Sequence, residues 1–104
     1  MSRIEREQKA KILKALAFYI HKKEPAVQAL TQCFEAEGRG GKHRQWKPAQ
    51  AVLETDGFVP ALLTGELIGQ EAAQILSVVE AAGDHRLLSA AINALVEYHE
   101  NADD

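Results

Sequence analysis

The sequence predicts an all-α fold, a six-helix antiparallel bundle built from two three-helix halves and containing no sheet. Hydrophobic residues make up 46% of the 104 residues but aromatic residues only 6%. The apolar content is therefore mostly Ala, Leu, Ile and Val, and of these Ala and Leu favour helix. Apolar residues recur at helical spacing, and few stretches alternate as a half-buried strand does. A chain of this length indicates a single domain, residues 1–104.

The first predicted helix covers residues 3–22, with apolar side chains on one face and Lys and Arg on the other. Basic amphipathic helices can lie on membranes or nucleic acids, but most are simply solvated. A second predicted helix covers residues 25–37 and begins at Pro25, whose missing N–H costs nothing at the first helical position. Its predicted core residues are Val27, Leu30 and Phe34, with Cys33 beside them.

Three glycines in four residues predict a loop at 38–41. A nucleotide-binding loop would carry a Lys-Ser or Lys-Thr pair after a buried strand. Here Lys42 is followed by His43 and no strand precedes it, so we do not expect nucleotide binding. The basic segment 42–47 contains Trp46, which we interpret as a core residue, because one aromatic side chain is too few for a nucleic-acid stacking platform.

The third predicted helix covers residues 48–55, and a turn at Asp56 and Gly57 follows it. A short helix is expected at residues 60–64, where Gly65 would stop it. Apolar side chains in and around this short helix are expected to close the end of the bundle: Phe58, Leu62, Leu63, Leu67 and Ile68.

Two further helices are predicted at residues 70–82 and 84–101. Between them, Gly83 can take the left-handed conformation that ends a helix. Asp84 can then cap the next helix through its side-chain oxygen. We therefore predict a tight helical hairpin. Its predicted inward faces are Ala72, Ile75, Leu76 and Val79 in one helix, and Leu88, Ala91, Ile92, Leu95 and Tyr98 in the other.

Charge is divided unevenly along the chain. Residues 1–52 hold 11 of the 12 Lys and Arg residues and five acids, whereas residues 53–104 hold Arg86 and ten acids. Two interpretations remain open. The two halves attract each other in the folded domain, or a basic face is available to an acidic partner, a phosphate or an anionic lipid.

Several classes of function are not expected. Cys33 is the only cysteine, so an intramolecular disulfide is excluded. The four histidines include no pair at the i, i+4 spacing of a zinc-binding helix, and no nucleophile–base arrangement can be placed. We therefore predict no catalytic residue, metal or cofactor, and a protein that is not an enzyme. No apolar run approaches the ~20 residues of a membrane span and no signal peptide is evident, so the chain is expected to be soluble.

Three motifs follow one another in a specific order. A helix leads into a turn, then Pro25 and an Ala-Leu pair that ends at Leu30. A short segment that starts after the glycine-containing turn carries a second Ala-Leu pair, ending at Leu62. The third motif has the form Gly-Glu-x-x-Gly before a Leu-rich helix, and Glu80 and Gly83 match its Glu and its second Gly.

In this order the motifs resemble the type II secretion F domain, the cytoplasmic domain of the inner-membrane platform proteins of type II secretion systems and type IV pili. The resemblance covers about residues 12–98, with 1–11 and 99–104 as flanks. The glycine usually found before the motif Glu is Val79 here, the glycine usually found before Pro25 is replaced, and no membrane span follows the last helix. The chain is expected to be an excised domain or a stand-alone relative.

The resemblance implies a six-helix scaffold without catalysis on the cytoplasmic face of the bacterial inner membrane. Its implied partners in pilus biogenesis or protein secretion are the assembly ATPase and other inner-membrane components. It also implies a homodimer that binds no nucleic acid and reaches the membrane only through spans absent from this chain. The implied structural residues are Pro25, Leu30, Gly57, Leu62, Glu80, Gly83 and Asp84. The candidate partner-binding residues are Arg39, Lys42, Arg44 and Lys47.

Two alternatives stay open. Glu80 is either an architectural carboxylate that receives a helix N-terminus or a backbone N–H across the hairpin, or part of an interface or cation site with Asp84 and Glu97. Calcium sites need six or more oxygen ligands, and the chain has no EF-hand spacing. The second alternative is a small helical nucleic-acid-binding or regulatory adaptor, whose basic face would bind phosphates with an affinity that falls steeply with salt.

Overall fold

The computed structural model describes residues 3–39 and 43–101, and the side chains of residues 7–39 and 45–98. Within these residues the fold is all-α, as predicted, and contains no strand. No helix in the described part of the chain is both long enough and apolar enough to cross a membrane. The six helices are α1 (Arg3–His21), α2 (Ala26–Arg39), α3 (His43–Thr55), α4 (Phe58–Thr64), α5 (Gln70–Ala81) and α6 (His85–Asn101).

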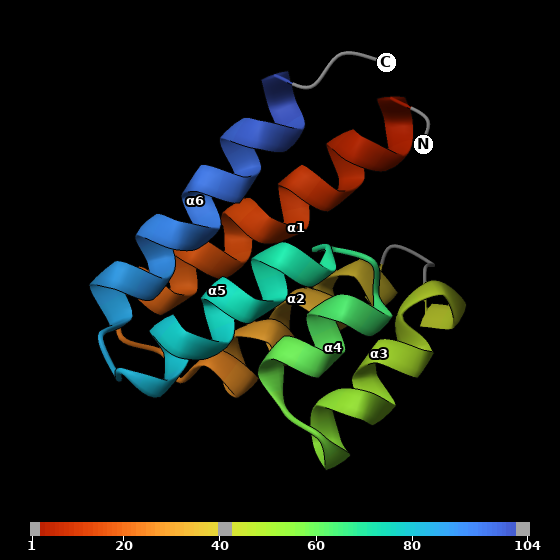
Figure 1. The fold of residues 1–104 in the computed structure, drawn as a ribbon. Helices are drawn as coiled ribbons and strands as arrows, with labels where there is room; N and C mark the ends of the chain where they lie inside the picture. The colour runs from red at the N-terminus through yellow and green to blue at the C-terminus, as the bar shows by residue number, and fades with distance from the viewer. Residues whose placement is uncertain (1–2, 40–42, 102–104) are drawn as a thin grey trace.

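The first and last helices are the central pair of the fold. Helices α1 and α6 lie side by side and antiparallel along most of their length (Figure 1). Helices α2, α3 and α4 pack on one another, and α5 joins α4 to α6. The two predicted three-helix halves are therefore not separate units, because the α1–α6 and α3–α4 contacts run between them.

Helix α3 begins earlier than predicted, at His43 rather than residue 48, so that Pro48 lies inside the helix. Proline removes one helical hydrogen bond. Trp46 lies in the first turn of this helix, where its side chain is 2% exposed and stacks on the Phe34 ring with 5.5 Å between ring centroids. Trp46 is thus a core residue, as predicted, and it fixes the first turns of α3 against α2.

The hydrophobic core contains buried side chains from all six helices. Cys33 belongs to it as a small buried residue, which confirms that interpretation. Leu30 and Leu62 are also completely buried. The largest fully buried side chains are Trp46, Phe34, Phe58, Leu13, Leu16, Ile20, Leu30, Leu62, Leu67, Leu76 and Ile92.

Several predicted inward positions are wrong. Ile75 is 61% exposed and Tyr98 71% exposed, and Val27 also lies at the surface. Helix α5 buries only a narrow stripe, centred on Leu76, because it packs on α4 and α6 and has no helix over its outer side. The residues buried instead in the other helices are Ala49, Leu53 and Val96.

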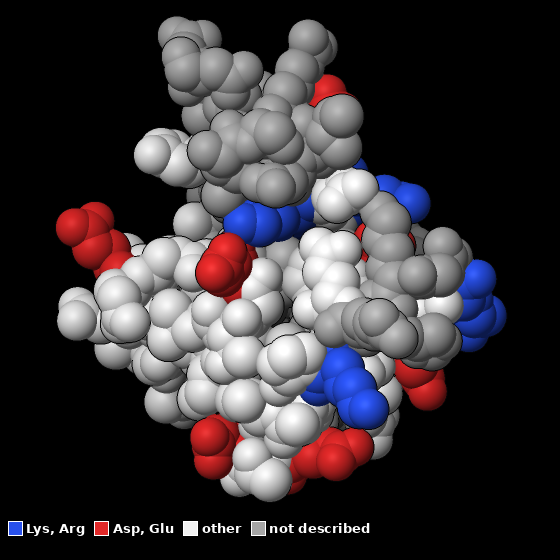
Figure 2. Space-filling model, turned by 90° about the vertical axis from the view of Figure 1, so that its right-hand side faces the viewer, with Lys and Arg blue, Asp and Glu red and all other residues white. Residues whose placement is uncertain are grey.

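Basic and acidic side chains are mixed on the face shown in Figure 2. Lys and Arg side chains there lie beside Asp and Glu side chains, with uncharged residues between them. The described residues on this face therefore form no single basic surface. The mostly basic α1 also packs on α6, which belongs to the acidic half of the chain. This arrangement agrees with the interpretation that the two halves attract each other.

Candidate functional site

The α5–α6 turn has the geometry predicted for it. Gly83 has a φ of 76°, and its N–H donates to the Glu80 carbonyl at 3.1 Å. The Asp84 Oδ1 accepts hydrogen bonds from the backbone N–H of Arg86 at 3.0 Å and of Leu87 at 3.2 Å. Gly83 therefore ends α5 and Asp84 caps α6. Hydrogen bonds hold the turn between the two helices at both of its ends.

Helix α1 also ends at a residue in the left-handed conformation, but this residue is Lys23, with a φ of 75°. The Lys23 N–H donates to the Ile20 carbonyl at 2.9 Å, and the Glu24 N–H donates to the Tyr19 carbonyl at 3.1 Å. These two bonds form a Schellman motif, which usually has glycine at this position. The sequence showed that the glycine usually found before Pro25 is replaced in this chain. It did not predict that Lys23 would adopt the left-handed conformation typical of that glycine.

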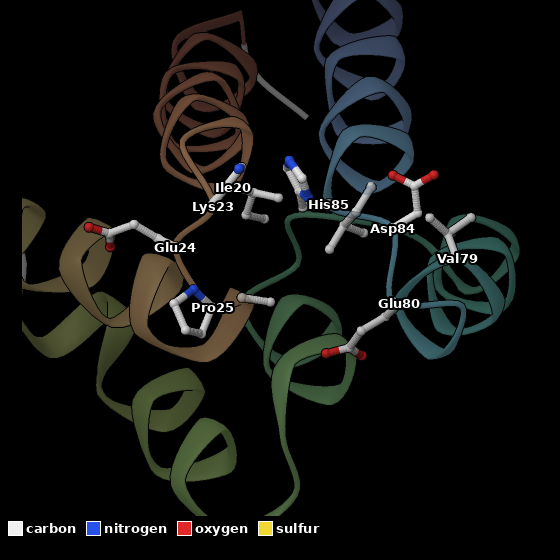
Figure 3. A pocket seen from close by; sticks show the side chains of 11 residues that line it. Ile20, Lys23, Glu24, Pro25, Val79, Glu80, Asp84 and His85 are labelled. Carbon is white, nitrogen blue, oxygen red and sulfur yellow. The ribbon is translucent and has the colours of Figure 1, made fainter.

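These two turns meet at one end of the domain and enclose a pocket of about 260 Å³ (Figure 3). The α1 end and the α1–α2 turn contribute Ile20, Lys23, Glu24, Pro25 and Ala26. The α5–α6 turn and its helices contribute Val79, Glu80, Gly83, Asp84, His85 and Leu88. Four residues of the predicted structural motif therefore lie together, although the sequence places them in two distant segments: Pro25, Glu80, Gly83 and Asp84.

The other predicted motif residues lie outside this pocket. Leu30 and Leu62 are core residues. Gly57 precedes α4 with a φ of 107°, a conformation that favours glycine. These three residues support the fold, and the structure does not bring them to the site.

The three carboxylates that line the pocket differ in their partners. The Glu24 Oε2 accepts a hydrogen bond from the Gln32 Nε2 at 2.6 Å, and the Asp84 carboxylate caps α6. The Glu80 carboxylate has no hydrogen-bond or ion-pair partner among the described residues. The backbone N–H expected to bind Glu80 across the hairpin is therefore not found within the described part of the chain.

Glu80 is half-buried, and this burial raises the pKa of its carboxyl group above the ordinary value. Its side chain extends from α5 toward the side of the pocket where Pro25 lies, whereas the Asp84 carboxylate points away (Figure 3). The cationic lining residue Lys23, which belongs to the same turn as Pro25, and the half-buried His85 lie above Pro25 and the Glu80 carboxylate in this view. Sequence reasoning missed both of them, because neither belongs to a motif.

The basic candidates are only partly described. Arg39 is exposed in the last turn of α2, and Lys47 is exposed on α3. Lys42 lies outside the described residues. Arg44 lies in α3, but its side chain is not among those described. The structure therefore supports solvent access at two of the four positions.

Cys33 and the acidic side chains do not suggest a reaction centre. Cys33 lines a smaller cavity of about 120 Å³ between α1 and α2. Burial, with a smaller contribution from Glu37, raises the pKa of the Cys33 thiol to about 12, so the thiolate is scarce at neutral pH. Within the described residues, no three His, Cys, Asp or Glu side chains are grouped so that they could hold a metal ion.

No protein-family model, curated protein or solved structure matches the chain. The function therefore has to be inferred from the fold and from the pocket at which the two turns meet. The chemical feature that distinguishes this pocket is the half-buried Glu80 carboxylate, which has no partner among the described residues.

Proposed function

We propose that this chain is a non-enzymatic interaction domain of an inner-membrane platform protein in type IV pilus biogenesis or type II secretion. One observation carries the proposal: the two motif segments, one at Pro25 and one at residues 80–84, line the same pocket. The six-helix all-α order also agrees with what the resemblance implies. On this proposal the domain lies on the cytoplasmic face of the membrane, acts as a homodimer and contacts the assembly ATPase.

The geometry of the two turns suits a docking role. The Schellman motif at Lys23 and the Asp84 cap hold the backbone on each side of the pocket. A rigid surface loses little conformational entropy when a partner binds. The exposed Arg39 and Lys47 lie on α2 and α3, and they supply positive charge for an acidic surface of the same or another partner.

Charge reversal tests the ATPase contact. We expect the double variant Arg39→Glu, Lys47→Glu to capture about fivefold less of the proposed partner, a type IV pilus or type II secretion assembly ATPase, because exposed charge pairs contribute up to about 1 kcal/mol each. The measurement is co-purification from cells at low salt, with circular dichroism to verify folding. Arg86→Glu is the matched control, because Arg86 is an exposed arginine outside the basic segment.

Two results would contradict the proposal. Unchanged ATPase capture by the folded double variant would show that these residues do not contact the ATPase. A gel shift with nucleic acid at low salt that disappears steeply with added salt would instead favour the nucleic-acid-binding adaptor.

A further inference from the structure

We propose that the pocket between the α1–α2 and α5–α6 turns accepts an arginine side chain of a partner protein, with the Glu80 carboxylate as its counter-ion. The inference deepens the proposed function, on which it rests for the identity of the partner. The chemistry of the pocket itself follows from four features: a carboxylate that has no partner among the described residues, the negative formal charge of the lining, the apolar walls and the volume.

Within the part of the chain that the structure describes, the Glu80 carboxylate is an acceptor without a donor. The Glu24 carboxylate is bound to the Gln32 amide at 2.6 Å, and the Asp84 carboxylate is bound to two backbone N–H groups of α6. Neither kind of contact is found for the Glu80 carboxylate among the described residues. Partial burial removes some of the water that hydrates a carboxylate. Without hydrogen-bond donors from the protein, those lost interactions are not replaced. A cationic donor from outside would restore those interactions.

The charge of the lining favours a cation over an anion. Three acidic residues and one lysine, Lys23, line the pocket, so the lining has a formal charge of −2 when His85 is counted as neutral. The Glu24 and Asp84 carboxylates point away from the pocket, whereas the Glu80 carboxylate extends toward the side where Pro25 lies (Figure 3). Lys23 makes no ion pair with Glu80, and Figure 3 shows it above the Glu80 carboxylate. The chain itself therefore leaves this carboxylate without a counter-ion within the described residues.

The walls and the volume fit an arginine side chain. Ile20, Val79 and Leu88 are buried or half-buried lining residues and offer apolar surface to a methylene stem. A volume of about 260 Å³ admits a side chain rather than a folded segment. Among the natural cations, a guanidinium group pairs with a carboxylate through two parallel hydrogen bonds and is more weakly hydrated than an ammonium group.

An NMR titration tests this assignment without any partner protein. The probe is N-acetyl-arginine-N-methylamide, added to the ¹⁵N-labelled chain, and the citrulline counterpart is the neutral probe of the same shape. We expect saturable shifts of the amide signals of Ala26, Glu80 and Gly83 with the arginine probe alone. We also expect Glu80→Gln to weaken binding at least about fivefold, since the ionic part of the pairing is lost.

Glu71→Gln is the matched control, because Glu71 is an exposed acid on the same helix outside the pocket. It should leave the arginine affinity unchanged. Equal shifts with citrulline, or equal affinity in Glu80→Gln and the wild type, would overturn the inference. Calcium that moves the same amide signals at micromolar concentration would overturn it in favour of a cation site.

The two proposals fail separately. Saturable arginine binding that needs Glu80, combined with unchanged ATPase capture by the Arg39→Glu, Lys47→Glu variant, supports the pocket assignment and contradicts the ATPase contact. Absence of arginine binding, combined with reduced ATPase capture by that variant, overturns the pocket assignment alone.

Discussion

Glu80 is the residue at which local helix chemistry and the folded structure differ most. Gly83 and Asp84 already account for the end of α5 and the start of α6, so the hairpin does not require a carboxylate at position 80. The sequence marked Glu80 through the motif that it shares with Gly83. It could not show that the carboxylate would have no partner among the described residues, because the opposite wall of the pocket comes from the α1–α2 turn.

The ionisation of Glu80 should oppose folding. Burial raises the pKa of Glu80 above the value of about 4.5 expected for an unfolded glutamate, so the folded state holds this proton to higher pH. The resulting stabilisation is complete below the unfolded pKa and is lost as the pH rises through the folded pKa. Glu80→Gln cannot ionise, so we expect it to keep this stabilisation at pH 7 and to be more stable than the wild type there. The gain in the free energy of unfolding should be below about 1 kcal/mol, because solvent screens the partly exposed group.

Urea unfolding at pH 4 and pH 7 measures this effect, with Glu71→Gln as the control. The difference in unfolding free energy between wild type and Glu80→Gln should be larger at pH 7 than at pH 4. A variant that is clearly less stable than the wild type at pH 7 would show that Glu80 has the architectural role instead.

At the scale of the element, the positions at which helices end were predicted better than the backbone conformations of the residues at those ends. Gly83 was expected to be left-handed and is. Gly65 was expected to stop α4, and α4 does end at Thr64, but Gly65 keeps a right-handed φ of −78° and the left-handed residue is Glu66, at a φ of 57°. Space is tight at Gly65, since a Cβ there would lie 3.3 Å from the Trp46 ring. Non-glycine residues in this conformation cost roughly 1 kcal/mol, so local propensity could not predict Lys23 and Glu66.

The Asp84 cap contributes to the stability of α6. Asp84→Ala removes the acceptor for two backbone N–H groups, and we expect a loss of about 1 kcal/mol in the free energy of unfolding. Asp84→Asn retains an acceptor oxygen and should lose clearly less. Urea unfolding of both variants measures the difference, and equal losses would indicate that the charge of Asp84, rather than its hydrogen bonds, stabilises the helix.

At the scale of the whole molecule, the sequence predicted the number and order of the helices. Their periodicity and the Pro, Gly and Asp residues between them were sufficient for that. The pairing of α1 with α6 was not predicted, because it joins the two ends of the chain and has no local signal. The exposed faces, such as Ile75 on α5, were missed for the same reason: the periodicity of a helix does not show which neighbours will cover it.

The α1–α6 pairing should make unfolding a single cooperative event. Ile92 on α6 is completely buried, so Ile92→Ala should cost about 2–5 kcal/mol. Trp46, the only tryptophan, lies on α3 in the other half of the chain. We expect its fluorescence to follow the same shifted urea transition as the helical circular dichroism signal. Two separate transitions would mean that the halves fold independently.

The antiparallel pairing of α1 and α6 also sets the distance between the pocket and the ends of the described chain. The start of α1 and the end of α6 lie together (Figure 1), whereas the end of α1 and the start of α6 contribute Ile20 and His85 to the pocket. Helix α1 has 19 residues and is therefore roughly 28 Å long. If either end is joined to a larger assembly or to a membrane, the two helices act as a spacer of that length and turn the pocket away from the attachment.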